Sequence, residues 1–287
     1  MKMPWGAYDQ QKGPKGERGM SRTQAQYMRR MKKRARRKRA WGLVLLGAVL
    51  VFTAWGYQVW QQKHEEAAQR TARSCQMPGQ TWYALRLGSF ETEGAAREQA
   101  VQFLGRGAGG VIKRAEGAFH LLAAAYENRA DAVRVQENLM RFYNVESDVY
   151  SLTWDGAQMT LSGTEKQTGA MQKCYDFMNA LGKTVSHLIL QLDEGAMSRA
   201  EAEGTVTSCM ESAQLLEKEL LSAFGREENV LSNDMGAALF RVRSAFEQAL
   251  REQGDVRFGA YVKRAHLEWA LAMQEHGMLL QGLISSP

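Results

Sequence analysis

The chain has 287 residues, a formal net charge of +6 and three cysteines. Cys75, Cys174 and Cys209 are too few and too far apart in sequence for a disulfide framework or a cysteine-ligated metal site. Residues 1–40 hold fourteen Lys or Arg against two acidic residues, whereas the remainder holds 23 basic and 29 acidic residues. The basic character therefore belongs to the N-terminal part of the chain and not to its body.

Residues 1–39 are predicted to form a basic and largely disordered tail. Residues 1–28 are rich in Gly and charge, and residues 29–39, RRMKKRARRKR, are Lys or Arg at nine of eleven positions. A cationic helix can bind nucleic-acid phosphates, but this run ends directly before an apolar segment. Membrane topogenesis and contact with anionic lipids explain it better, so we expect no nucleic-acid partner.

Residues 40–60 are predicted to form a transmembrane helix. The first eighteen of them carry no charge, and as a helix they extend about 27 Å, close to the hydrocarbon thickness of a bilayer. Trp41, Trp55 and Trp60 stand near the two ends, where interfacial aromatic residues are enriched. The apolar run is longer than the core of a cleaved signal peptide, and no small-x-small cleavage site follows it closely, so we expect an uncleaved signal anchor. Lys and Arg beside a span stay on the cytoplasmic side. The N-terminus is then cytoplasmic, and the C-terminal domains are extracytoplasmic.

Residues 61–79 are predicted to be a polar stalk that ends at Pro78-Gly79. In the following segment, residues 80–156, the apolar pattern alternates between strand and helix periods. The expected order is strand 82–90, helix 91–104, strand 109–114, strand 119–126, helix 127–142 and strand 145–154. The two halves superpose at an offset of 36 residues. This repeat predicts an α+β domain of βαββαβ order, a four-stranded antiparallel sheet with both helices on one face.

The second face of this sheet is predicted to be open. If Leu85 and Leu87 point to the helices, the period of two places Arg86 on the open face, together with Ala84 and Gly88. The remaining open-face positions are His120, Leu122 and Ala124 on the matching strand, with Lys113 and Tyr150 on the outer strands.

The stretch WYALRLGSF, followed by a helix, a Gly-rich turn and a weaker second copy, resembles the SPOR (sporulation-related repeat) domain of bacterial envelope proteins. Gly88-Ser89-Phe90 matches the family's Gly-Ser-Phe, and Leu85-Arg86-Leu87 fills its strand motif. The resemblance covers residues 80–154 and implies that the open face binds peptidoglycan glycan strands, in particular strands stripped of stem peptides. The residues it offers for glycan contact are Arg86, Ser89, Lys113, His120, Leu122 and Tyr150.

The sequence departs from the family pattern at three positions. Arg86 replaces the strand Gln, and Leu122 and Ala124 stand where a polar residue and a Gly are common. Sugars need hydrogen-bonding partners, and these changes reduce them. The alternative is therefore a retained fold whose glycan site is lost and whose face serves a protein partner.

Residues 162–287 are predicted to form an antiparallel helical bundle. Four stretches with apolar residues at spacings of three and four are separated by glycines, and the Ser-x-x-Glu sequences at 162–165 and 198–201 predict capping boxes for the first two helices. In a hairpin turning near residue 195, Cys174 and Cys209 lie about 10 Å apart along the helix axis. That spacing favours two small core residues, although pairing of these cysteines stays open.

The sequence offers no defensible catalytic, cofactor or metal site. No Glu-x-x-His pairing is present, GKT at 182–184 lacks the first Gly of a phosphate loop, and GRGAGG at 105–110 leaves a helix and enters a strand. We therefore expect a non-enzymatic single-pass envelope protein that binds glycan strands and acts in cell division or sporulation. The alternative is a membrane-anchored assembly protein whose helical bundle binds protein partners.

Overall fold

The computed structural model describes residues 70–225 and 229–285, so the predicted tail, the predicted span at 40–60 and most of the predicted stalk lie outside the described residues. No helix within the described ranges combines the length and the apolar character needed to cross a bilayer. The described residues belong to one compact unit, Ala67–Pro287. Their helices and two antiparallel sheets make an α+β fold, as the sequence predicted.

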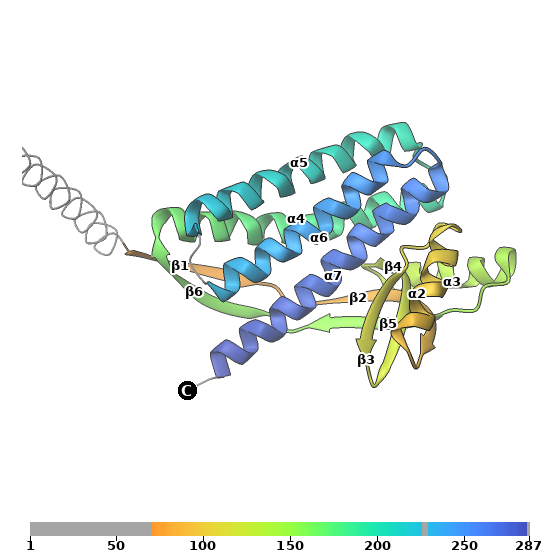
Figure 1. Ribbon diagram of the computed structural model, residues 1–287, viewed down its shortest axis with the longest axis horizontal. Helices are drawn as coiled ribbons and strands as arrows, with labels where there is room; N and C mark the ends of the chain where they lie inside the picture. The colour runs from red at the N-terminus through yellow and green to blue at the C-terminus, as the bar shows by residue number, and fades with distance from the viewer. Residues whose placement is uncertain (1–69, 226–228, 286–287) are drawn as a thin grey trace, which may run out of the picture. The chain divides into compact units, whose positions relative to one another are not determined.

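The four-stranded antiparallel sheet predicted for residues 80–156 is present, with strand order β3-β4-β2-β5. Its elements are β2 (Gln80–Phe90), α2 (Glu93–Leu104), β3 (Val111–Ala115), β4 (Ala118–Tyr126), α3 (Arg129–Tyr143) and β5 (Asp148–Trp154). Helices α2 and α3 pack on one face of this sheet (Figure 1), where they bury Ala96, Ala100 and Ala132. Thr92 caps α2 by accepting a hydrogen bond from the backbone N–H of Ala95.

A second, two-stranded sheet joins β1 (Arg70–Met77) to β6 (Ala157–Thr164). The sequence analysis placed residues 70–77 in a polar stalk, but they form a strand because their buried side chains are Cys75 and Met77, and because β6 supplies a distant partner. A Cβ atom on Gly79 would lie 2.7 Å from the backbone nitrogen of Gly156. Gly79 lies in the connection from β1 to β2, and Gly156 lies in the connection from β5 to β6.

Four long helices follow β6, as predicted: α4 (Glu165–Asp193), α5 (Arg199–Phe224), α6 (Val230–Arg251) and α7 (Asp255–Ser285). The capping box at Ser198 and Glu201 is confirmed. The first capping box is shifted, because β6 extends to Thr164 and this residue caps α4 together with Gln167. Cys174 and Cys209 are free thiols.

Helix α7 lies across the sheet face that the sequence analysis predicted to be open (Figure 1). The ring of Trp82 in β2 lies 4.9 Å from that of His266 and 4.8 Å from that of Trp269, centroid to centroid. His266 Nδ1 donates to the carbonyl oxygen of Ala125 at 3.1 Å. Ala84 and Leu122 are fully buried on this face, so its central part is not available to a ligand.

The prediction of an open face was wrong because α7 is apolar on more than one side. The stripe that the sequence assigns to the bundle runs through Phe258, Val262, Ala265, Trp269, Met273, His276 and Leu280. Leu267, Ala270 and Leu271 lie off that stripe and are buried as well. Two glycines permit the close approach: a Cβ on Gly109 would lie 2.9 Å from the backbone nitrogen of Arg264, and one on Gly277 would lie 3.2 Å from Trp154 Cβ. The sheet and the helices therefore share one hydrophobic core.

Replacing Gly182 by Ala is expected to destabilise the protein, because a Cβ at this position of α4 would overlap the ring of Trp269. Forcing extra volume into a packed core costs about 1–3 kcal/mol. The matched control is Gly169→Ala in the same helix, where a Cβ meets nothing within 4 Å and where the change should stabilise by roughly 0.5–1 kcal/mol. Urea denaturation measures both, and equal effects would contradict the contact of Gly182 in α4 with Trp269 in α7.

Stability is expected to fall in acid through His266, because burial lowers the pKa of this imidazole from 6.5 to about 4. The unfolded chain binds this proton first, so folded stability is lost as the pH falls from about 6.5 towards 4. Between pH 6.5 and 4.5 wild type should lose about 2 kcal/mol more than His266→Asn, which cannot titrate there. Urea midpoints measured across this range test it, with His187→Asn as the control on an exposed histidine. Identical slopes for wild type and His266→Asn would contradict the prediction.

Candidate functional site

Five of the six residues offered for glycan contact lie together at one end of the sheet face that α7 crosses. We call them the Tyr150 cluster: Arg86, Ser89, Lys113, His120 and Tyr150. The strand register explains the grouping, since Lys113 and Ser89 each pair with His120. The sixth residue, Leu122, is fully buried and cannot touch a ligand. Leu122 is therefore not part of the candidate site.

A β-bulge in β2 brings Ser89 into the cluster. Arg86 pairs with Leu122 and Ser89 pairs with His120, so β2 uses three steps where β4 uses two. The extra residue reverses the side-chain alternation. Strict period two predicted Gly88 on this face, and the bulge places Ser89 there instead.

The ring of Tyr150 lies at the centre of the cluster. Arg86 Cζ and Lys113 Nζ each lie 5.4 Å from its centroid, within the range of a cation–π contact, and the His120 ring centroid is also 5.4 Å away. Arg86 donates to both carboxylate oxygens of Asp148, from Nε at 2.9 Å and 3.1 Å and from Nη2 at 2.6 Å. Asp148 therefore fixes the guanidinium over the ring.

His120 is buried in the cluster, with only 3% of its surface exposed. Its Nδ1 lies 2.8 Å from Ser89 Oγ, whereas its Nε2 is buried and has no hydrogen-bond partner among the described residues. Burial first, and then the charge of Arg86, lower the pKa of this imidazole. The cluster thus contains a neutral imidazole with one unmet hydrogen-bonding position.

Helix α7 contributes Gln274 to the edge of the cluster. Lys113 Nζ donates to Gln274 Oε1, and Gln274 Nε2 donates to the carbonyl oxygen of Thr153 at 2.9 Å. Burial lowers the pKa of Lys113. Sequence reasoning missed Gln274 because 161 positions separate it from Lys113, and nothing in the sequence pattern of α7 marks it.

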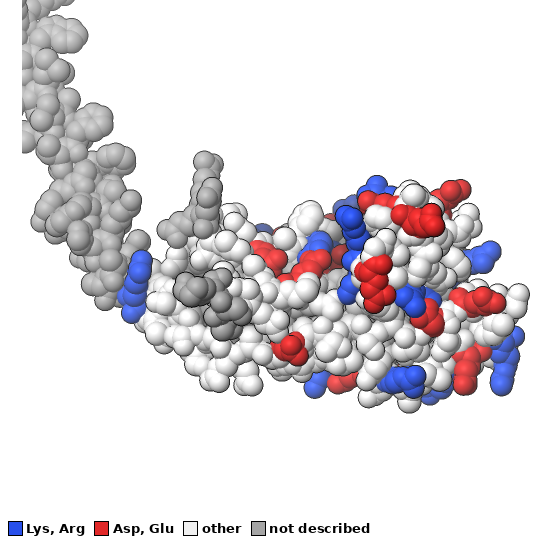
Figure 2. All heavy atoms as spheres, turned by 90° about the horizontal axis from the view of Figure 1, so that it is seen from below, with Lys and Arg blue, Asp and Glu red and all other residues white. Residues whose placement is uncertain are grey.

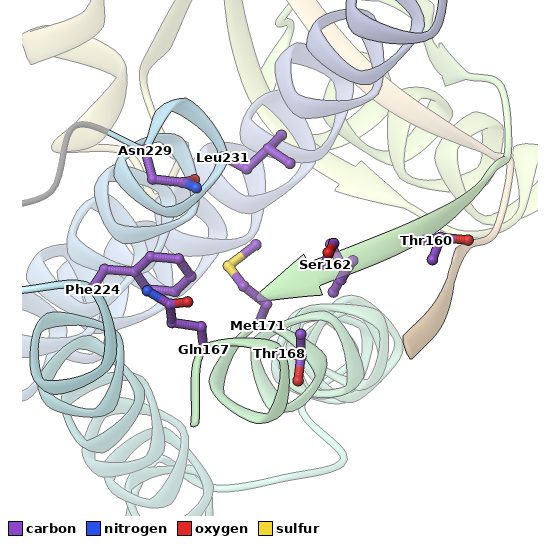
Figure 3. Close-up of a pocket in the computed structure, with 9 residues that line it drawn as sticks. Thr160, Ser162, Gln167, Thr168, Met171, Phe224, Asn229 and Leu231 are labelled. Atoms are coloured by element: carbon purple, nitrogen blue, oxygen red, sulfur yellow. The ribbon is translucent and has the colours of Figure 1, made fainter. Parts of the chain in front are cut away.

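Two hollows lie away from the cluster. A cavity of about 120 Å³ lies between β6, α4 and the adjoining ends of α5 and α6, and Figure 3 shows Met171 and Phe224 beside polar side chains on its wall. This volume is below the usual range for ligand sites. A larger groove of about 390 Å³ between α5 and α6 is lined by Leu221, Gly236 and Phe240, among others.

The bundle also contains a hydrogen-bonded Asp-His-Tyr series. His276 Nδ1 lies 2.5 Å from Asp234 Oδ2, and its Nε2 lies 2.6 Å from the hydroxyl of Tyr175. Tyr175 is fully buried, so a substrate cannot reach its oxygen, and we assign the series a structural role in joining α4, α6 and α7. No group of His, Cys, Asp and Glu within the described ranges could hold a metal ion.

No family model matches the chain, no curated protein matches it and no solved structure matches it.

Proposed function

We propose that this protein is a single-pass bacterial envelope protein that binds peptidoglycan glycan strands through a SPOR-like domain. The observation that carries the proposal is the Tyr150 cluster, in which Arg86, Lys113 and Ser89 offer hydrogen-bond donors beside an aromatic ring. The βαββαβ element order and the intact Gly88-Ser89-Phe90 add support. The proposed membrane anchor rests on the sequence of residues 40–60.

The geometry favours a polar ligand that lies along one end of the sheet. A sugar hydroxyl can accept from the guanidinium or the ammonium, and it can exchange hydrogen bonds with the Ser89 hydroxyl, which is exposed. Helix α7 closes the central face, so the proposed site is confined to one end of the sheet. The role is binding and localisation, in division or sporulation, with no catalytic step and no cofactor.

A second candidate function is assembly through the helical bundle. The groove between α5 and α6 carries two large exposed apolar side chains, Leu221 at 67% and Phe240 at 55% exposure. Exposed apolar patches of this kind mark protein contact sites. In this reading the bundle binds a protein partner, and the sheet serves as scaffold.

The proposed function is tested by co-sedimentation of the full-length protein, kept soluble in mild detergent, with purified sacculi. Sacculi are used intact and after enzymatic removal of the stem peptides. We expect more protein to pellet with the stripped sacculi, and about tenfold weaker binding for Arg86→Ala, which removes a charged donor. The full chain is needed because a fragment that contains only the four-stranded sheet and its two helices would lack α7. Trp82 and Leu122, which are buried in the intact protein, would then be exposed.

Two controls accompany this measurement. Arg114→Ala removes an exposed cation on the opposite face of β3, where it lies 5.8 Å from the Phe119 ring, and should bind as wild type does. Phe240→Glu alters the bundle groove and should also leave binding unchanged. Failure of the wild type to pellet with either sacculus preparation would contradict glycan binding and favour the assembly function.

A further inference from the structure

The helical bundle carries a groove whose two banks are alike. Helices α5 and α6 run side by side (Figure 1), and the groove of about 390 Å³ between them has Leu221 on the α5 bank and Phe240 on the α6 bank. Both side chains are more than half exposed. Each bank therefore offers one large apolar side chain to a molecule that docks there.

The two apolar side chains stand at the same level along the groove. Because a short connection joins them, α5 and α6 run antiparallel, and an ion pair of 2.8 Å between Glu217 and Arg243 marks their register. Leu221 follows Glu217 and Phe240 precedes Arg243, so both lie about one turn from the ion pair in the same direction. Arg243 Cζ lies 5.2 Å from the centroid of the Phe240 ring, and this contact holds the ring in place.

This arrangement of the banks is self-complementary. A two-fold axis along the groove exchanges the banks, so it sets Phe240 of each copy against Leu221 of the other. Gly236 lines the groove one turn before Phe240, and a Cβ atom there would meet nothing within 4 Å. The open space beside Gly236 can receive a side chain of the second copy.

The charges beside the groove complement each other under the same exchange. Lys218 on the α5 bank is exposed and forms no ion pair within the described ranges. Glu247 lies two turns beyond Phe240 on the same side of α6, and 37% of its side chain is exposed. In the symmetric arrangement Lys218 of one copy and Glu247 of the other are offset along the groove by about 7 Å, which an extended lysine side chain can span.

Long-range attraction does not favour docking on the face shown in Figure 2. Basic and acidic side chains are interspersed on that face, without a large area of one sign. Local complementarity must therefore determine where two copies meet, and the groove between α5 and α6 provides it in both its apolar and its charged side chains.

We propose that the groove between α5 and α6 binds the same groove of a second copy of this chain and so forms a symmetric dimer. The inference rests on the assembly function proposed for the bundle and names its partner. It does not involve the Tyr150 cluster, so it is independent of glycan binding.

The test is sedimentation velocity of the full-length protein in mild detergent over a range of concentrations. We expect a dimer whose dissociation constant rises about a hundredfold in Leu221→Glu, because the symmetric contact loses two buried leucine side chains. Val101→Glu is the matched control, since Val101 of α2 is 73% exposed and lies outside the groove, and it should dimerise as wild type does.

A charge exchange tests the symmetry of the contact. Lys218→Glu should weaken the dimer about tenfold at low salt, because it sets two pairs of like charges against each other. Adding Glu247→Lys should restore most of the affinity, which a variant that merely unfolds could not do. A double variant as weak as Lys218→Glu would overturn the proposed register.

The remaining outcomes separate the dimer from the assembly function. A monomeric wild type, or a dimer that persists in Leu221→Glu, would overturn the proposal. A photo-reactive phenylalanine analogue at position 221 then identifies what contacts the groove in the native cells. A crosslink to a different protein would overturn the dimer and leave the assembly function standing, whereas a crosslink to neither would overturn both.

Discussion

The packing of α7 across the four-stranded sheet is the interaction on which the rest of the structure depends. Trp82, His266 and Trp269 meet in the core with less than 2% of each residue exposed. A buried aromatic side chain removes about 150–250 Å² from water, which corresponds to roughly 4–6 kcal/mol of gross stabilisation for each indole. Without this contact the sheet would expose one face and α7 would expose a second apolar side, so neither layer would be stable in the observed form.

The same packing determines where a ligand can bind. Helix α7 closes the central face, and it leaves the Tyr150 cluster at one end with Gln274 on its edge. The proposed site is therefore a composite of the sheet and the C-terminal helix. The proposed site therefore needs both layers, because α7 supplies Gln274 and the sheet supplies Lys113.

The local elements could be predicted from sequence, because their signals lie within a few residues. The alternation in WYALRLGSF predicted β2, and Ser198 with Glu201 predicted the start of α5. The features that failed are non-local: β1 needs β6 as a partner, and α7 needs the sheet to bury Leu267. Five of the residues proposed from sequence lie together because they share one sheet face. Leu122 is buried and Gln274 was missed, and both of these outcomes depend on α7.

The most direct test of one shared core is native-state hydrogen exchange of the full-length protein, compared amide by amide between α7 and β4. If the sheet and α7 are stabilised by the same packing, the amides around Trp269 and those around Ala125 should exchange through one opening with the same free energy. Exchange of α7 through a separate, lower-energy opening while β4 stays protected would contradict this account. It would show that the sheet face can become free and that α7 is only a cover.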